Sequence, residues 1–242
     1  MENVLTTNML SVGYKHKEIV SKINIEVKKG EIVTMIGPNG TGKSTILRTL
    51  AGLQKSLSGT VNICGKDIND YRETELAQHV SILMTDRVEP ELMTGYDIVC
   101  SGRYPYTGRL GILSDKDRQV VEEVMELVNI SNLKDSFFRE LSDGQKQRFM
   151  LARAICQEPD ILIMDEPMTF LDIKYKRELA EIILRLKEEK KISIIMSLHE
   201  LHLIKKFTDK VVCIKDGGVD KIGAINEILN DEYIDYLFDI EK

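Results

Sequence analysis

A glycine-rich stretch at residues 37–44 constrains this chain more than any other part of its sequence. It reads Gly-Pro-Asn-Gly-Thr-Gly-Lys-Ser and fits the pattern Gly-x-x-x-x-Gly-Lys-Ser/Thr. The apolar run at residues 32–36 before it predicts a buried strand, and residues 45–53 after it have helical spacing. In such a strand–turn–helix, backbone N–H groups can surround phosphate oxygens, and the helix N-terminus adds a favourable dipole. The sequence therefore predicts a phosphate-binding loop.

The residue types in this loop suit a nucleoside triphosphate. Lys43 is expected to reach the β- and γ-phosphates, and Ser44 is expected to bind Mg²⁺. A chance glycine-rich turn is the alternative, but the strand before it and the helix after it favour the functional interpretation. The predicted nucleotide-binding residues are Asn39, Gly40, Thr41, Gly42, Lys43, Ser44 and Thr45.

A second motif is an apolar strand that ends in two acidic residues. Residues 161–164 are Ile-Leu-Ile-Met, and Asp165 and Glu166 follow them. Asp165 is expected to hold Mg²⁺ through water, and Glu166 to act as the general base that polarises an attacking water. Alone, such a run is more often a strand that leaves the core. Because a phosphate-binding loop is also present, the catalytic interpretation is favoured.

The order of predicted elements indicates an α/β fold with parallel strands. Strands are predicted at residues 23–27, 32–36, 59–65, 161–164, 192–196 and 211–214, and helices at 45–53, 114–128, 142–156 and 173–190. The middle of the chain is predicted to be a helical insertion, in which Ser114 and Asp117, three residues later, predict a capping box at the start of a helix. We therefore expect one domain, 1–242, with a nucleotide-binding core at 1–85 and 157–242 and an insertion at 86–156.

Composition and charge exclude several classes of protein. The 242 residues carry a net charge of −6, which argues against a nucleic-acid binder. No apolar run reaches 18 residues and the N-terminus lacks a signal-peptide pattern, so a cytoplasmic chain is expected. The cysteines lack a Cys-x-x-Cys pair and the histidines are scattered, which argues against a zinc site. Cys64, Cys156 and Cys213 follow apolar residues and are expected to be small core residues.

The segment Leu-Ser-Asp-Gly-Gln at residues 141–145 completes an ordered set of motifs. By itself it could be only a helix cap, with Ser142 at the N-cap and Gln145 three residues later. Together with the glycine-rich loop, the Asp-Glu strand and the late His199, it resembles the ATP-binding-cassette (ABC) ATPase family over nearly the whole chain. The resemblance implies a P-loop NTPase core with an N-terminal antiparallel β subdomain and an inserted helical subdomain.

The resemblance also implies ATP and Mg²⁺, bound between two copies of the chain in a head-to-tail homodimer. Each ATP would lie between one phosphate-binding loop and the partner's signature segment. His199 would contact the γ-phosphate, Tyr14 would stack on adenine, and Asp172 would belong to the loop that crosses to the partner. The implied signature contacts are Ser142, Gly144 and Gln145.

Three positions depart from the family's pattern. Leu198 stands directly before His199, where the family has threonine. Asp143 stands where the signature segment usually has glycine. Thr85 stands in the segment where the family carries a glutamine that contacts magnesium. Because a threonine hydroxyl reaches less far, Thr85 is expected to contact the metal only through a water, with Asp86 as the alternative.

The segment Gly-Arg-Tyr-Pro at residues 102–105 resembles cassettes that serve iron-chelate (siderophore or haem) or corrinoid importers. A generic tight turn is the alternative. The resemblance implies integral-membrane permease subunits as partners, an external substrate-binding protein acting indirectly, and a place on the inner face of the cell membrane. A soluble ABC ATPase without a transport role is the second hypothesis. The single phosphate-binding motif and the lack of sustained heptads argue against translation- and repair-type cassettes.

Overall fold

A mixed β-sheet runs through the computed structural model, which describes residues 2–15, 17–84, 90–169 and 171–240. The spatial order is β6-β5-β1-β2-β11-β10-β4-β9-β8-β7, and β3 pairs with β1. The strands are β1 (Asn3–Tyr14), β2 (Lys17–Ile23), β3 (Glu26–Lys28), β4 (Ile32–Ile36), β5 (Ser58–Ile63), β6 (Lys66–Asp67), β7 (Val80–Leu83), β8 (Ile161–Asp165), β9 (Ser193–Ser197), β10 (Lys210–Lys215) and β11 (Gly218–Ala224).

The neighbouring strands β10, β4, β9, β8 and β7 are parallel, as the sequence predicts. Every residue of β4, β8 and β9 is buried, so apolar side chains occupy both faces of the sheet. Ile161 and Ile163 pack into one core with helix α1, whereas Leu162 and Met164 pack into a second core with helices α5 and α6. The alternation of strand side chains thus gives the domain two apolar cores, one on each side of the sheet.

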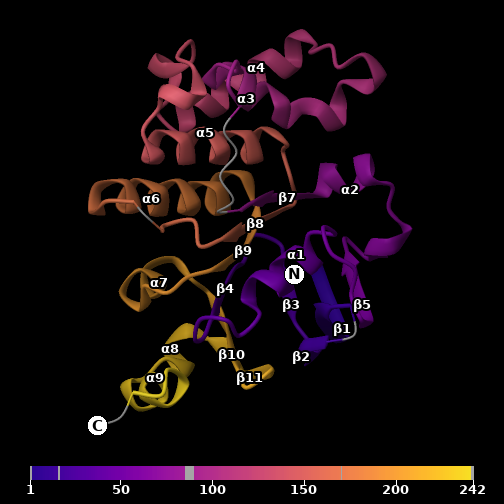
Figure 1. The fold of residues 1–242 in the computed structure, drawn as a ribbon, viewed down its shortest axis with the longest axis vertical. Helices are drawn as coiled ribbons and strands as arrows, with labels where there is room; N and C mark the ends of the chain where they lie inside the picture. The colour runs from indigo at the N-terminus through magenta and orange to yellow at the C-terminus, as the bar shows by residue number, and fades with distance from the viewer. Residues whose placement is uncertain (1, 16, 85–89, 170, 241–242) are drawn as a thin grey trace.

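The helices are α1 (Lys43–Leu50), α2 (Glu73–His79), α3 (Gly95–Cys100), α4 (Asp115–Leu127), α5 (Asp143–Cys156), α6 (Ile173–Lys190), α7 (Leu201–Phe207), α8 (Ile225–Ile228) and α9 (Asp231–Leu237). Figure 1 shows α3, α4 and α5 together at one end, above α6, with the antiparallel strands β1, β2 and β5 in the opposite half. The predicted capping boxes of Ser114 and Ser142 are both present. Among the described residues, no helix has the length and apolar character needed to cross a bilayer.

Two predicted elements are wrong in detail. The strand predicted at residues 23–27 is interrupted, because the side chain of Asn24 accepts from the Met9 N–H and donates to the Lys22 carbonyl. The chain passes there from β2 to β3, and both strands pair with β1. The first helix begins at Lys43 rather than residue 45 and ends at Leu50, two residues before Gly52, whose φ is +75°.

The cysteine expectation is also wrong at one position. Cys156 and Cys213 are buried, but Cys64 is exposed. Ile63 pairs with Lys66, so Cys64 and Gly65 form the two-residue turn between β5 and β6. Ile63 is apolar because it is a buried residue at the end of β5. Its character therefore does not predict the burial of Cys64, which already belongs to the turn.

A buried arginine fixes the segment at residues 102–105. The Arg103 guanidinium donates to Asp117 Oδ1 at 2.9 Å and to Glu158 Oε2 at 2.8 Å, and it also bonds the Cys156 carbonyl. Only 2% of Arg103 is exposed. A Cβ on Gly102 would lie 2.2 Å from the Arg153 carbonyl oxygen, so only glycine allows this approach to α5. The segment therefore ties the short helix η2 (Ser101–Tyr106) to α4 and to the end of α5.

Replacing Arg103 tests this anchor. Arg103→Met should lower the free energy of unfolding by about 3–5 kcal/mol, because Asp117 is left as a buried carboxylate without its cation. Lys116→Met, an exposed change beside Asp117 on α4, should alter the free energy of unfolding by less than about 0.5 kcal/mol. Urea unfolding at pH 7 measures both values, and equal effects would contradict the anchor.

The same pair predicts a pH dependence. Burial raises the pKa of Asp117, but hydrogen bonds from Ser114 and Arg103 outweigh it and leave that pKa below its usual value. The stabilisation is present above the unfolded-state pKa of about 3.9 and is lost as the pH falls through the lower folded-state value. The stability difference between the wild type and Arg103→Met should therefore narrow below about pH 4.

Candidate functional site

The glycine-rich loop leaves the N-terminus of α1 open to a ligand. Gly42 is the N-cap residue with φ +96°, and no side chain caps the helix. A Cβ on Gly42 would lie 2.7 Å from methyl carbons of Ile19 and Val20, so the site requires glycine for both backbone and space. The N–H groups in the first turn of a helix lack intrahelical partners and favour anions.

Lys43 is held within this loop. Its ammonium donates to the Gly37 and Pro38 carbonyl oxygens, each at 2.8 Å, and only 5% of the residue is exposed. Burial lowers the pKa of Lys43, while the negative charges of Glu166 and Asp165 raise it. The predicted lysine and the two predicted acidic residues therefore lie in one electrostatic environment.

Ser197 connects the two acidic residues at the end of β8. Its hydroxyl donates to Asp165 Oδ1 at 2.6 Å and accepts from the Glu166 N–H at 2.9 Å. The connection follows from the sheet register, in which Asp165 and Ser197 are paired residues of the parallel strands β8 and β9. The sequence analysis does not predict a role for Ser197. Its position directly after the predicted strand at 192–196, two residues before His199, could have indicated one.

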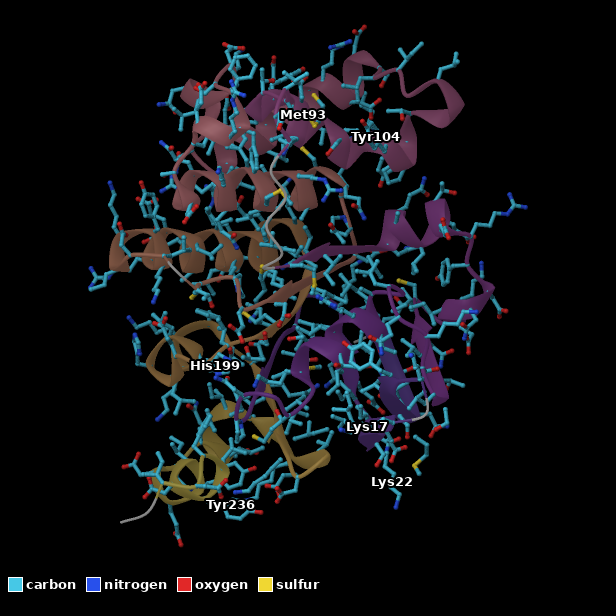
Figure 2. The ribbon with its side chains drawn as sticks, in the orientation of Figure 1. Lys17, Lys22, Met93, Tyr104, His199 and Tyr236 are labelled. Atoms are coloured by element: carbon cyan, nitrogen blue, oxygen red, sulfur yellow. The ribbon has the colours of Figure 1, made fainter. Side chains whose placement is uncertain are left out.

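Glu166 and His199 form a hydrogen-bonded pair. His199 Nε2 lies 2.7 Å from Glu166 Oε1, and each side chain is about one-third exposed. The Thr169 hydroxyl donates to the other carboxylate oxygen at 3.2 Å. Glu166 also has a left-handed backbone, with φ +46°. Figure 2 shows His199 near α7, far from Met93 and Tyr104 in the helical part of the fold.

Lys43, Glu166 and His199 line one hollow of about 340 Å³, within the usual range for ligand pockets, whereas Asp165 and Ser197 do not line it. Thr41 does not line it and instead donates its hydroxyl to the Pro38 carbonyl at 2.9 Å. Ile19, from β2, is a lining residue that we did not predict. The complete lining is Ile19, Asn39, Gly40, Gly42, Lys43, Ser44, Thr45, Glu166 and His199.

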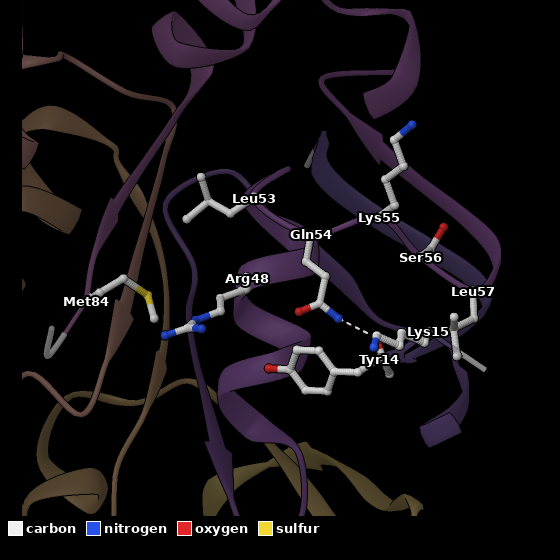
Figure 3. Close-up of a pocket in the computed structure, with 10 residues that line it drawn as sticks. Tyr14, Lys15, Arg48, Leu53, Gln54, Lys55, Ser56, Leu57 and Met84 are labelled. Carbon is white, nitrogen blue, oxygen red and sulfur yellow. Dashed lines mark hydrogen bonds between the residues drawn. The ribbon is translucent and has the colours of Figure 1, made fainter. Parts of the chain in front are cut away.

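Tyr14 lies at a neighbouring hollow of about 650 Å³, shown in Figure 3. Gly13, Gln54 and Met84 also line this second hollow, and the Gln54 amide donates to the Gly13 carbonyl. Tyr14 is 52% exposed, so one face of its ring is open for stacking. Its stacking on adenine stays a prediction.

The donors in the first hollow fit a magnesium-bound triphosphate. An uncapped helix N-terminus and a lysine suit phosphate oxygens, and a hydroxyl beside a carboxylate suits a hard cation. Asp165 is only 5% exposed and is held by Ser197, so its oxygen is fixed near the loop. Ser44 and Asp165 are the residues that would hold Mg²⁺. Thr85, the third predicted contact, lies outside the described residues, as does Asp86.

The signature segment lies apart from this hollow in the same chain. Ser142 caps α5 by accepting from the Gln145 N–H at 3.4 Å, and Gln145 Oε1 accepts from the Ser142 N–H at 2.9 Å. A Cβ on Gly144 would lie 3.4 Å from the Tyr175 ring. In Figure 1, α5 lies in the upper half and α1 in the lower half. Within the described residues, none of the signature segment lines the hollow.

Asp172 has a local role in the structure. Its carboxylate caps α6 by accepting from the Tyr175 N–H at 2.9 Å. The Arg148 guanidinium on α5 lies 4.5 Å from the Tyr175 ring and pairs with Glu178 on α6. Asp172 thus begins the helix against which the signature helix packs. Contact of Asp172 with a second subunit stays a prediction.

Replacing Ser197 tests the positioning of the acidic pair. Ser197→Ala should raise the Mg²⁺ concentration needed for half-maximal ATP turnover by about 10–100-fold, because Asp165 loses the donor that orients it. Ser81→Ala is the control, since Ser81 is a buried β7 serine whose hydroxyl makes only a 3.4 Å contact with Gln157. A Mg²⁺ titration of phosphate release measures both variants. An unchanged Mg²⁺ requirement in Ser197→Ala would remove Ser197 from this role.

Comparison with known proteins establishes the family. A model described as ABC transporter matches residues 20–169. An uncharacterized ABC transporter ATP-binding protein of Methanocaldococcus jannaschii is 41% identical, covering 99% of this chain and 82% of its own length. The iron(3+)-hydroxamate import ATP-binding protein FhuC of Bacillus subtilis is 34% identical, covering 99% and 89%.

A solved structure has the same fold. CbiO1 of Clostridium perfringens, part of the ABC transporter complex CbiONQ, superposes with a TM-score of 0.83 and 27% identity. The match covers 97% of this chain and 93% of CbiO1. The predicted cassette fold is therefore confirmed, and the chain belongs to the ABC transporter family.

Proposed function

We propose that this chain is the ATP-hydrolysing subunit of an importer for iron chelates or corrinoids. The observation that carries the proposal is the 2.7 Å contact between Glu166 and His199 at a hollow lined by the phosphate-binding loop. A carboxylate in that position can accept a proton from a water that attacks the terminal phosphate, giving ADP and phosphate.

Residues in the hollow and directly behind it share this chemistry. Lys43 and the α1 N–H groups would hold the phosphate oxygens, and Ser44 with Asp165 would hold Mg²⁺. Mg²⁺, when bound, neutralises phosphate charge. Glu166 takes the proton, and His199 orients its carboxylate through the hydrogen bond to Oε1. Ser197 keeps Asp165 and Glu166 in fixed relative positions.

A complete site requires two copies of the chain. The signature residues Ser142, Gly144 and Gln145 begin α5, away from the hollow of their own chain. In a head-to-tail homodimer, each signature segment would face the phosphate of the partner's nucleotide. In this arrangement the α5 N-terminus would contribute its helix dipole, Asp172 would lie at the subunit boundary, and Tyr14 would stack on adenine. A water-mediated metal contact of Thr85 remains part of the same proposal.

The proposed transport role is supported by the relatives of this chain and by its helical insertion. FhuC is an iron(3+)-hydroxamate import ATP-binding protein, and it aligns with 99% of this chain. We place the chain on the inner face of the membrane, bound to permease subunits, with an external protein delivering the chelate. The insertion at 86–156 is the proposed docking region, beside the core at 1–85 and 157–242. An ABC ATPase without a transport role is the alternative.

Two single variants define the halves of the composite site. Glu166→Gln should reduce ATP turnover by about 10²–10⁴-fold while keeping nucleotide binding, because only the proton acceptor is lost. Ser142→Arg should also stop turnover, because its bulk faces the partner's nucleotide, although its own loop still binds ATP. Phosphate release and binding of a fluorescent ATP analogue measure the two properties separately.

Mixing the two variants tests the dimer. One hybrid site would combine the Glu166 of the Ser142→Arg chain with the intact signature of the Glu166→Gln chain, so phosphate release should recover in part. The control is each variant alone at the same total concentration. If cross-linked hybrid dimers form and stay inactive, the composite site is wrong.

The partner separates the two functional hypotheses. A tagged chain, expressed in its native host and purified in mild detergent, should retain a polytopic membrane protein in stoichiometric amount. ATP turnover by that complex should rise in the presence of the external binding protein carrying its chelate. A chain that binds no membrane protein and turns over ATP at full rate alone would favour the role without transport.

A further inference from the structure

Three metal-ligating side chains meet on the side of the fold where the antiparallel strands join the core. Cys64 lies in the turn between β5 and β6, His79 ends α2, and Asp160 precedes β8. Cys64 Sγ lies 3.7 Å from Asp160 Oδ2, and His79 Nδ1 lies 2.7 Å from the same oxygen. One ligand atom from each residue lies within 4.8 Å of the other two.

We propose that Cys64, His79 and Asp160 form a binding site for a divalent cation of the zinc type. Thiolate and imidazole ligands select Zn²⁺ and similar transition metals, whereas Mg²⁺ and Ca²⁺ prefer oxygen ligands throughout. A thiolate and a carboxylate together balance the two charges of the cation. The absence of a Cys-x-x-Cys pair concealed this site, because its ligands come from three separate segments of the chain.

The spacing of the three groups is close to that of a tetrahedral site. Ligand atoms about 2.0–2.3 Å from a tetrahedral Zn²⁺ lie about 3.3–3.5 Å from one another. The contact between Cys64 and Asp160 is near this value, and the shorter contact between His79 and Asp160 would open by about half an ångström. Rotation of side chains suffices for that change, because all three groups are partly exposed.

The accessibility of the site defines how it would bind metal. Cys64 is exposed, and the side chains of His79 and Asp160 are 32% and 37% exposed. Three protein ligands leave a fourth position for water, as in sites that exchange a ligand. Binding would displace the thiol proton to solvent, and the bound cation would link the β5–β6 turn to α2 and β8.

The turn itself does not account for the cysteine. Cys64 and Gly65 both have positive φ, +47° and +81°, in a two-residue hairpin connection. Asparagine followed by glycine is the favoured pair in such turns, because asparagine tolerates the left-handed region better than most residues. The strained position therefore presents a thiol toward Asp160 at a cost that the hairpin does not require.

A set of hydrogen bonds without metal is the competing interpretation. In that arrangement Asp160 accepts from both the Cys64 thiol and the His79 ring. Without metal, the Cys64 thiol keeps its proton and donates it to Asp160 Oδ2. The two interpretations differ in one respect, namely whether a cation converts the thiol to a thiolate ligand.

Cobalt provides the direct test. The full chain, stripped with a chelator and kept reduced without added nucleotide, is titrated with Co²⁺. A thiolate ligand gives a sulfur-to-cobalt charge-transfer absorption in the near ultraviolet, which should saturate at one equivalent and disappear when Zn²⁺ is added. Cys64→Ser should abolish this absorption, and His79→Gln should weaken Zn²⁺ binding by more than about 100-fold, since even loss of an outer-sphere partner costs 10–100-fold.

Matched controls separate this site from the nucleotide site and from the other cysteines. Cys100→Ser and His202→Gln should keep the full absorption, because neither residue belongs to the cluster. All four variants should bind a fluorescent ATP analogue as the wild type does, since none of the cluster residues lines the phosphate hollow. A wild-type chain without the charge-transfer band, or a band that persists in Cys64→Ser, would overturn the proposal while leaving the ATPase proposal intact.

Discussion

The two hydrogen bonds of Ser197 determine how Asp165 and Glu166 are placed relative to each other, and the arrangement of the whole site depends on them. A buried carboxylate at the end of β8 is stable only if polar partners satisfy it, and the hydroxyl of the paired residue on β9 supplies one. The same oxygen accepts from the next backbone N–H, so Asp165 and Glu166 cannot move independently. Glu166 in turn meets His199, which follows the same strand as Ser197. The ends of two adjacent strands thereby fix Asp165, Glu166 and His199 relative to one another.

The features that could be predicted from the sequence are those whose residues all lie within one short segment of the chain. The phosphate-binding loop, the Asp-Glu strand and both capping boxes fall into this class, because their geometry depends on neighbours within a few residues. Ser197 and Arg103 were not assigned roles in advance, since their partners lie 32 and 14 or more positions away in the chain. Cys64 was misassigned for a related reason, because burial of a turn residue depends on where the turn meets the core.

Helix α5, which begins at the signature segment, is hydrogen-bonded to the segment that follows Glu166. The Gln147 amide on α5 donates to the Pro167 carbonyl at 3.2 Å, one residue after Glu166. Arg148 pairs with Glu178 on α6, and its guanidinium lies 4.5 Å from the Tyr175 ring. Displacement of α5 by a bound permease would therefore be transmitted to the segment that follows the base. These contacts give a direct route between the helical insertion and the chemistry, through hydrogen bonds and packing alone.

Because both faces of β8 are buried, its apolar side chains alone do not fix its register in the sheet. A strand with one polar face has a fixed register, because a slip of one residue would expose its apolar side chains. In β8, Ile161 and Ile163 toward α1 and Leu162 and Met164 toward α5 and α6 are apolar, so a slipped strand would bury nearly the same apolar surface. The polar pair Asp165 and Ser197 breaks this degeneracy, since it can form only in the native alignment. Asp165 and Ser197 thus select, among near-equivalent packings, the one arrangement of the central sheet.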